Sequence, residues 1–236
     1  ERHSRLAVCS FGAPADRART TFALVGDSHA SAWRGAFDPA ARGLGWRGLS
    51  LTRTGCPLTA ASLATKGRVR RHCRQWNREV TAWFARNPSV TTVFVAARAG
   101  LDVIGDEAAV ARGYARAWDT LPASVRRIVV IRDTPRLRAS TLDCVDAADA
   151  DGRRMNVACA VPRRRALRPD PQLAAMRLVR NRRVVAIDLT PAFCDARACY
   201  PVIGGALAFR DEDHLTRTFA ATLAPSLREV VRRATG

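Results

Sequence analysis

A small polar cluster, Gly26-Asp27-Ser28-His29, follows an apolar run at residues 21–25 and precedes a helix-like segment. This pattern predicts a strand, a tight turn and a helix. Ser28 would then stand at the carboxyl edge of a sheet, where the N–H groups and the positive dipole end of the helix also point. An acyl-transferring nucleophile needs that environment. Asp and Ser also turn chains and cap helices without doing any chemistry, so the cluster alone leaves both interpretations open.

A carboxylate and a histidine stand three residues apart near the other end of the chain, as Asp211 and His214. A histidine in reach of a serine acts as its general base, and a carboxylate fixes the imidazole tautomer and stabilises the imidazolium. Asp211 is the preferred orienting acid because three residues can fold back within one turn. Four other acids remain as alternatives: Glu212, Asp213, Asp133 and Asp188.

The sequence contains four histidines, so the base can be sought by elimination. His3 lies in the N-terminal arm and His72 lies in a loop flanked by cysteines. His29 directly follows the serine, and neighbouring side chains at a helix start point apart. His214 remains as the predicted base. We expect Asp27 to organise the turn and His29 to shape the site or cap the helix.

With Gly-Asp-Ser-His early and Asp-x-x-His late, the sequence resembles the SGNH/GDSL hydrolase superfamily. It is most similar to the SGNH domains fused to the C-terminus of membrane acyltransferase-3 proteins, which O-acylate cell-surface glycans. The resemblance implies that Gly55, after the second strand, supplies an N–H group to the oxyanion hole. The superfamily usually presents an asparagine donor after its third strand, whereas this sequence has Arg98 there. Arg98 is therefore expected to assist the oxyanion or to bind substrate.

Apolar strands alternate with amphipathic helices along the chain, which predicts an α/β domain with a parallel sheet between helical layers. The expected strands cover residues 21–26, 46–52, 90–97, 127–132 and 183–189, and the expected helices cover residues 30–43, 73–86, 106–120, 169–180 and 216–233. By resemblance the fold is three-layer α/β/α and flavodoxin-like, with about five strands in the order 2-1-3-4-5. We expect one domain over residues 1–236, with an N-terminal arm at 1–20. A polar, loop-rich insertion at 136–168 is expected to serve as a lid or acceptor-binding element.

Seven cysteines are many for a cytosolic protein of this length. Their spacing predicts three local disulfides, Cys56 with Cys73, Cys144 with Cys159 and Cys194 with Cys199, and leaves Cys9 for a partner in sequence that precedes the chain. Disulfides indicate an extracytoplasmic location. The spacing of His72-Cys73 with the other cysteines fits no common zinc pattern, so neither a metal nor a cofactor is expected.

The net charge is +18 and is carried almost wholly by arginine. Such a charge attracts nucleic acids or anionic surfaces. The arginines are scattered along the chain and only 6% of the residues are aromatic, which leaves little for base stacking and argues against a nucleic-acid partner. The basic patches at residues 68–71 and 163–165 indicate solvated faces, with anionic wall polymers or lipid headgroups as alternative partners.

No apolar run approaches the roughly 18 to 20 residues that cross a bilayer. The chain begins at Glu1 with neither a methionine nor a signal peptide. We therefore expect a soluble piece of a longer protein. If the resemblance holds, an N-terminal membrane acyltransferase domain of that protein delivers the acyl donor.

Three functions fit these observations. The first is an O-acyltransferase that moves an acyl group, with acetyl as the expected group, onto a surface carbohydrate acceptor. The second is a secreted carbohydrate esterase that uses water, and the third is a non-catalytic glycan-binding module. The paired motifs argue against the third. A Ser-His-Asp triad does not separate the first two, because both form the same acyl-enzyme, but the resemblance and the departure at Arg98 favour the transferase.

Overall fold

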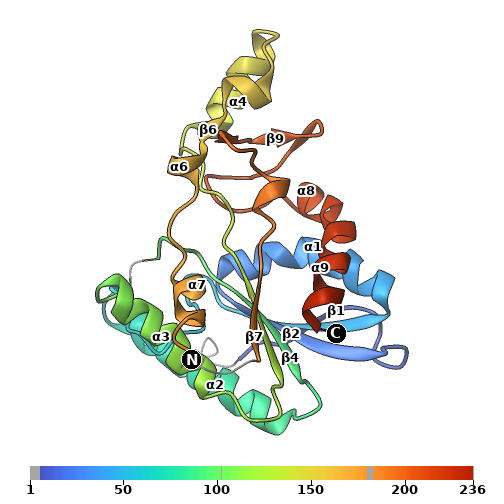
Figure 1. Ribbon diagram of the computed structural model, residues 1–236, viewed down its shortest axis with the longest axis vertical. Coiled ribbons are helices and arrows are strands. Elements are labelled where there is room, and N and C mark those ends of the chain that lie inside the picture. The colour runs from blue at the N-terminus through green and yellow to red at the C-terminus, as the bar shows by residue number, and fades with distance from the viewer. Residues whose placement is uncertain (1–5, 102, 180–182, 236) are drawn as a thin grey trace.

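A mostly parallel sheet of six strands forms the centre of the molecule (Figure 1). The computed structural model describes residues 6–101, 103–179 and 183–235. In spatial order the strands are β1 (Cys9–Gly12), β3 (Trp46–Thr52), β2 (Thr20–Gly26), β4 (Thr92–Ala96), β5 (Arg127–Ile131) and β7 (Val184–Ile187). The strands from β3 to β7 run parallel and have the expected order 2-1-3-4-5. β1 was not expected, because the sequence analysis placed only an arm there, and it pairs antiparallel with β3 at the edge of the sheet.

Helices cover both faces of the sheet, which confirms the three-layer α/β/α arrangement. One face is covered by α1 (Ser28–Leu44), α8 (Arg217–Thr222) and α9 (Ala224–Thr235), and the other by α2 (Arg68–Arg86), α3 (Glu107–Asp119) and α7 (Pro171–Met176). Successive side chains of a strand point to opposite faces. Phe22 and Leu24 of β2 enter the core under α1, whereas Ala23 and Val25 enter the core under α2 and α3. β2 is therefore buried on both sides, as its unbroken apolar run predicts.

A group of short elements extends beyond the sheet at one end of the molecule (Figure 1). It contains α4 (Thr141–Ala150), α5 (Met155–Ala158), β6 (Val161–Pro162), α6 (Arg163–Ala166), the 3₁₀-helix η1 (Thr190–Ala192), β8 (Ala198–Cys199), β9 (Val202–Ile203) and β10 (Ala206–Leu207). Val145, Ala148 and Val202 form a small core there with Cys159. The prediction of a loop-rich insertion at 136–168 was therefore wrong, since that segment contains three helices and a strand. The exposed aspartates of α4 hide its few apolar positions in the sequence pattern.

Two predicted helices have different bounds in the structure. α2 begins at Arg68, five residues before the predicted start, so the basic patch at 68–71 is helical and so is His72, which was expected in a loop. The helix predicted at 169–180 ends at Met176. Arg180, the predicted last residue of that helix, and His3 lie outside the described residues.

The closing helix predicted at 216–233 is divided into α8 and α9 at Leu223. Pro225 explains the break, because proline has no N–H group to donate and its ring clashes with the carbonyl four residues earlier. Pro225 is tolerated where it stands, in the first turn of α9, because the N–H groups of a first turn have no helical acceptor. None of the described helices is both long and apolar enough to cross a membrane.

Three disulfides tie down the loops around this framework. They join Cys56 to Cys73, Cys144 to Cys159 and Cys194 to Cys199, which are the pairs that the spacing predicts. The remaining cysteine, Cys9, is a free and exposed thiol on β1.

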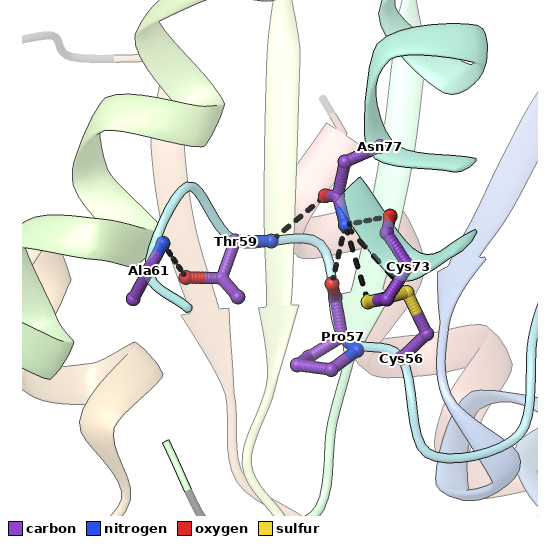
Figure 2. The surroundings of a disulfide bond; sticks show 6 residues. All are labelled: Cys56, Pro57, Thr59, Ala61, Cys73 and Asn77. Carbon is purple, nitrogen blue, oxygen red and sulfur yellow. Dashed lines mark hydrogen bonds between the residues drawn. A yellow bond between two sulfur atoms is a disulfide. The ribbon is translucent and has the colours of Figure 1, made fainter. Parts of the chain in front are cut away.

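Figure 2 shows how the first disulfide fixes the loop that follows β3. The amide oxygen of Asn77 accepts a hydrogen bond from the Thr59 N–H group (3.0 Å). The amide nitrogen of Asn77 donates to the carbonyl of Pro57 (3.2 Å) and to that of Cys73 (3.1 Å). One side chain of α2 therefore holds the two loop residues Pro57 and Thr59, just after Cys56.

Candidate active site

The turn between β2 and α1 presents Ser28 at the carboxyl edge of the sheet. Gly26 ends β2 with φ +150°, and a Cβ atom there would lie 1.8 Å from the Ala96 carbonyl oxygen. Only glycine fits so close to β4. Asp27 then caps α1, since its carboxylate accepts from the His29 N–H group at 2.8 Å. Ser28 is the first residue of α1, where N–H groups have no helical acceptor.

The side chain of Ser28 contacts the predicted base. His214 Nε2 lies 2.8 Å from Ser28 Oγ. On the other side of the ring, His214 Nδ1 lies 2.9 Å and 3.0 Å from the two carboxylate oxygens of Asp211. The three side chains thus stand in the order that a nucleophile, a general base and an orienting acid require.

Asp211 is held in its place by the backbone of its own loop. Its Oδ1 accepts from the N–H groups of His214 (2.7 Å) and Asp213 (3.0 Å). Burial alone would raise the pKa of Asp211, but these two N–H groups and the nearby His214 ring outweigh it and lower that pKa. The carboxylate is therefore negative at neutral pH and can orient the ring.

Two arginines fasten the loop that carries His214. Arg98 Nη2 lies 3.1 Å from Glu212 Oε1, and Arg98 Nε lies 2.8 Å from Asp213 Oδ2. Arg136 Nη2 lies 2.5 Å from the same Glu212 oxygen. Thr134 Oγ1 also donates to the Asp213 carbonyl at 2.8 Å. These contacts favour an anchoring role for Arg98 over the expected contact with an oxyanion or a substrate.

Asp27 joins the turn to the end of β4. Its second carboxylate oxygen accepts from the Arg98 N–H group at 2.9 Å. Burial raises the pKa of Asp27 although the charge of His29 and the two N–H groups lower it. Asp27 thus holds the turn by hydrogen bonds on both of its carboxylate oxygens, in the way that the sequence analysis expects.

Gly55 lies in the loop after β3, at the same edge of the sheet as Ser28. The parallel register places Thr52 of β3 beside Gly26 of β2, so both chains leave the sheet at one level. Among the described residues, no acceptor takes a hydrogen bond from the N–H group of Ser28 or of Gly55. Both groups are available to a negatively charged oxygen, which is the role that the resemblance implies for Gly55.

His29 lies beside the predicted triad, in a position that fits the expectation that it shapes the site. Its ring centroid is 4.7 Å from that of His214. His29 Nδ1 lies 2.5 Å from Asp133 Oδ1, and His29 Nε2 lies 3.5 Å from Asp213 Oδ1. Asp133 and Asp213, which the sequence analysis kept as alternative acids, therefore belong to the site through His29. The sequence does not reveal the contact between Asp133 and His29, because the two residues are 104 positions apart.

Asp213 also approaches the base directly. Its Oδ1 lies 3.3 Å from His214 Nδ1, slightly farther than Asp211. Asp188, the remaining alternative, instead accepts from Arg132 Nη1 at 2.9 Å. The acids that face His214 are thus Asp211 and Asp213.

His29, Asp213 and His214 bring three ligand-type atoms within 4.8 Å of one another. The set does not suit a metal ion, because His214 Nδ1 and Nε2 face Asp211 and Ser28. A bound ion would have to displace one of these partners. We assign no metal role to these side chains.

Two hollows lie near the site, and one of them borders the loop that carries His214. A cavity of about 300 Å³ opens beside Arg98 and is lined by Tyr114 and Asp170 among mostly apolar residues. A groove of about 970 Å³ follows α1 and reaches Arg210, at the start of the loop, and Leu215, at its end. Either hollow has room for part of a substrate.

Comparisons with known proteins point in one direction. A family model described as an SGNH domain fused to AT3 domains matches residues 1–229. No curated protein matches the chain. Among solved structures, the chain is similar to the periplasmic domain of a lipopolysaccharide acetyltransferase from Salmonella ser. Paratyphi A. The two share 14% sequence identity with a TM-score of 0.72, over 92% of this chain and 85% of the other, so this likeness concerns the fold.

Proposed function

Because the chain belongs to the family of SGNH domains fused to AT3 domains, we propose that it is an extracytoplasmic O-acyltransferase. It moves an acyl group, with acetyl as the expected group, through an acyl-enzyme on Ser28 to a hydroxyl of a cell-surface carbohydrate. The observation that carries the proposal is the 2.8 Å contact between His214 Nε2 and Ser28 Oγ, with Asp211 behind the ring. The acetyltransferase with the same fold supports the choice of acetyl.

The first half of the reaction forms the acyl-enzyme. Ser28 Oγ attacks the carbonyl carbon of the donor ester while His214 Nε2 takes the serine proton. The carbonyl oxygen becomes an oxyanion, which the N–H groups of Ser28 and Gly55 stabilise. When the carbon–oxygen bond to the donor breaks, His214 returns its proton to the departing oxygen.

The second half repeats these steps with the acceptor. His214 now takes the proton of an acceptor hydroxyl, whose oxygen attacks the acyl carbon on Ser28. The bond to Ser28 Oγ breaks, the proton returns to that oxygen and the acylated sugar leaves. Water reacts in the same way, so transfer requires that a sugar hydroxyl occupies the place of water at high effective concentration.

The groove along α1 is the proposed place of the acceptor. It is lined by Ser31, one helical turn after Ser28, and by Arg210 at the start of the loop that carries the base. Arg34 adds a second exposed guanidinium group. None of the residues 136–168, where the sequence analysis expected an acceptor element, lines this groove. A chain of sugars lying along α1 would bring one hydroxyl to Ser28.

The parent protein supplies the donor and the location in this proposal. Since the family consists of SGNH domains fused to AT3 domains, the membrane domain is the proposed source of the acyl group. Three disulfides support an extracytoplasmic location, because such bonds persist in oxidising compartments.

The test is the partitioning of one acyl donor between water and sugars. The protein is given an aryl acetate together with neutral or acidic surface oligosaccharides, and free acetate and acetylated sugar are quantified by mass spectrometry. We expect slow hydrolysis alone and faster release of the aryl group, with acetylated sugar as product, when the right acceptor is present. Ser28→Ala should abolish both products. Fast hydrolysis with no acetylated sugar from any acceptor would instead establish a secreted carbohydrate esterase.

A further inference from the structure

A second ionic cluster lies against the triad, and the reaction described above does not use it. At its centre stands His29, between Asp133 at the end of β5 and Asp213 on the loop of the base. We propose that His29 is a positioning residue, a buried cation that holds Asp213 against the ring of His214 and so keeps the base aligned with Ser28.

The geometry calls for a charged ring. Both nitrogens of His29 face carboxylate oxygens, Nδ1 toward Asp133 at 2.5 Å and Nε2 toward Asp213 at 3.5 Å. A neutral imidazole carries one N–H group, so its other nitrogen would turn a lone pair toward a carboxylate. The protonated ring has two N–H groups and suits both acids.

Burial and the surrounding charges support the same state. The His29 side chain is almost inaccessible to solvent, and such burial by itself lowers a histidine pKa. The charge and hydrogen bond of Asp133, followed by Asp213 and Asp27, outweigh that effect and raise the pKa of His29 to about 10. The remaining titratable group that faces the ring is His214, whose ring packs against it.

His29 affects the orientation of His214 through the carboxylate of Asp213. Its Oδ1 lies between the two imidazoles, 3.5 Å from His29 Nε2 and 3.3 Å from His214 Nδ1. Its Oδ2 faces Arg98 Nε at 2.8 Å. Without a positive charge at His29, only His214 would balance the attraction of Asp213 Oδ2 to Arg98. The carboxylate would then turn toward Arg98, and the ring of His214 would lose one of its two orienting acids.

The first test needs no mutation. With only four histidines in the chain, the ring nitrogens of each can be followed by ¹⁵N NMR of the histidine-labelled protein between pH 5 and pH 9. We expect one ring to keep two protonated nitrogens up to pH 8.5, and His29→Gln identifies it by the loss of its signals. If every ring lost a proton below pH 7.5, the inference would be wrong. This result does not depend on the acyltransferase proposal.

The second test measures kcat and KM for hydrolysis of an aryl acetate. His29→Gln should lower kcat about tenfold with little change in KM, because the ring of His214 loses one of its two orienting acids. His72→Gln, on the outer helix α2, is the matched control and should leave both constants unchanged. Melting temperatures of both variants show whether they are folded. Should His29→Gln not fold, the NMR experiment on the unaltered protein decides alone.

A double-mutant cycle separates this role from general support of the fold. If His29 acts through Asp213, the double variant His29→Gln/Asp213→Asn should have a kcat only slightly lower than that of Asp213→Asn alone. Fully additive losses, or an unchanged kcat in His29→Gln, would refute the inference. Neither outcome would affect the acyltransferase proposal, for which Ser28→Ala is the criterion.

Discussion

Removal of the disulfide between Cys56 and Cys73 should cost more stability than removal of the one between Cys194 and Cys199. The first pair encloses a sequence separation of 17 residues and the second a separation of 5. In the loop-entropy model, closing these loops stabilises the folded protein by about 3 and about 2 kcal/mol, a difference of about 1 kcal/mol. All four cysteines are buried, so replacement by alanine removes similar packing from each pair.

The measurement is the free energy of unfolding from urea titrations of the two double variants, Cys56→Ala/Cys73→Ala and Cys194→Ala/Cys199→Ala. For a chain of this length, about 3 kcal/mol corresponds to a fall in melting temperature of about 6 to 12 °C. Equal losses, or a larger loss for the shorter loop, would contradict the entropic reasoning. Hydrolytic activity below the melting transition should largely persist in the first variant, because Asn77 still holds the loop next to Gly55.

Three further predictions concern the site. Ser28→Ala should abolish hydrolysis of an aryl acetate and leave the melting temperature nearly unchanged, which circular dichroism and a chromogenic assay together establish; retained activity would exclude Ser28 as the nucleophile. Arg98→Met should destabilise the protein by about 3 kcal/mol, since it leaves the buried carboxylate of Asp213 without its nearest arginine, and should depress kcat; an unchanged urea midpoint would count against the anchoring role. Stability should fall at alkaline pH, because the pKa of His29 is about 10 in the folded protein and about 6.5 in the unfolded chain. The stabilisation by the charged His29 is complete below pH 6.5 and is lost as the pH rises through 10. Urea midpoints at pH 6 and pH 10 should therefore differ less in His29→Gln than in the unaltered protein.

The part of the fold that could be predicted from sequence is the part in which local pattern and burial agree. The unbroken apolar run of β2 is buried on both faces, and Gly26 with Asp27 marks the turn that follows it. The pair Asp211 and His214 was recognisable for a similar reason, because three residues close their contact within one turn. These elements could be predicted from local sequence alone, without knowing which distant residues contact them.

The strand β1 was not predicted, because the residue that indicates its presence, Gly48, lies in the neighbouring strand β3. Its four residues are too few for a clear pattern. Gly48 in the middle of β3 leaves the space into which the ring of Phe11 packs, and a Cβ atom there would lie 2.1 Å from that ring. A glycine within a strand often marks such a close approach, but its partner cannot be identified without the fold.

The cluster around His29 could not be predicted for a different reason. Asp133 and Asp213 reach His29 from separate parts of the chain, and aspartates at strand ends and in loops are too common to single out. The position of His29 next to Ser28 in the sequence also gives no information about the loop of His214, which folds over it.

The separation of the proposed nucleophile from its proposed base along the chain has a consequence for biogenesis. Ser28 and His214 are 186 residues apart, so a growing polypeptide acquires its serine early and its histidine late. In the proposed mechanism, no base activates the Ser28 hydroxyl until the loop of His214 has folded against it. A growing chain would therefore not react with esters in its surroundings before its folding is complete.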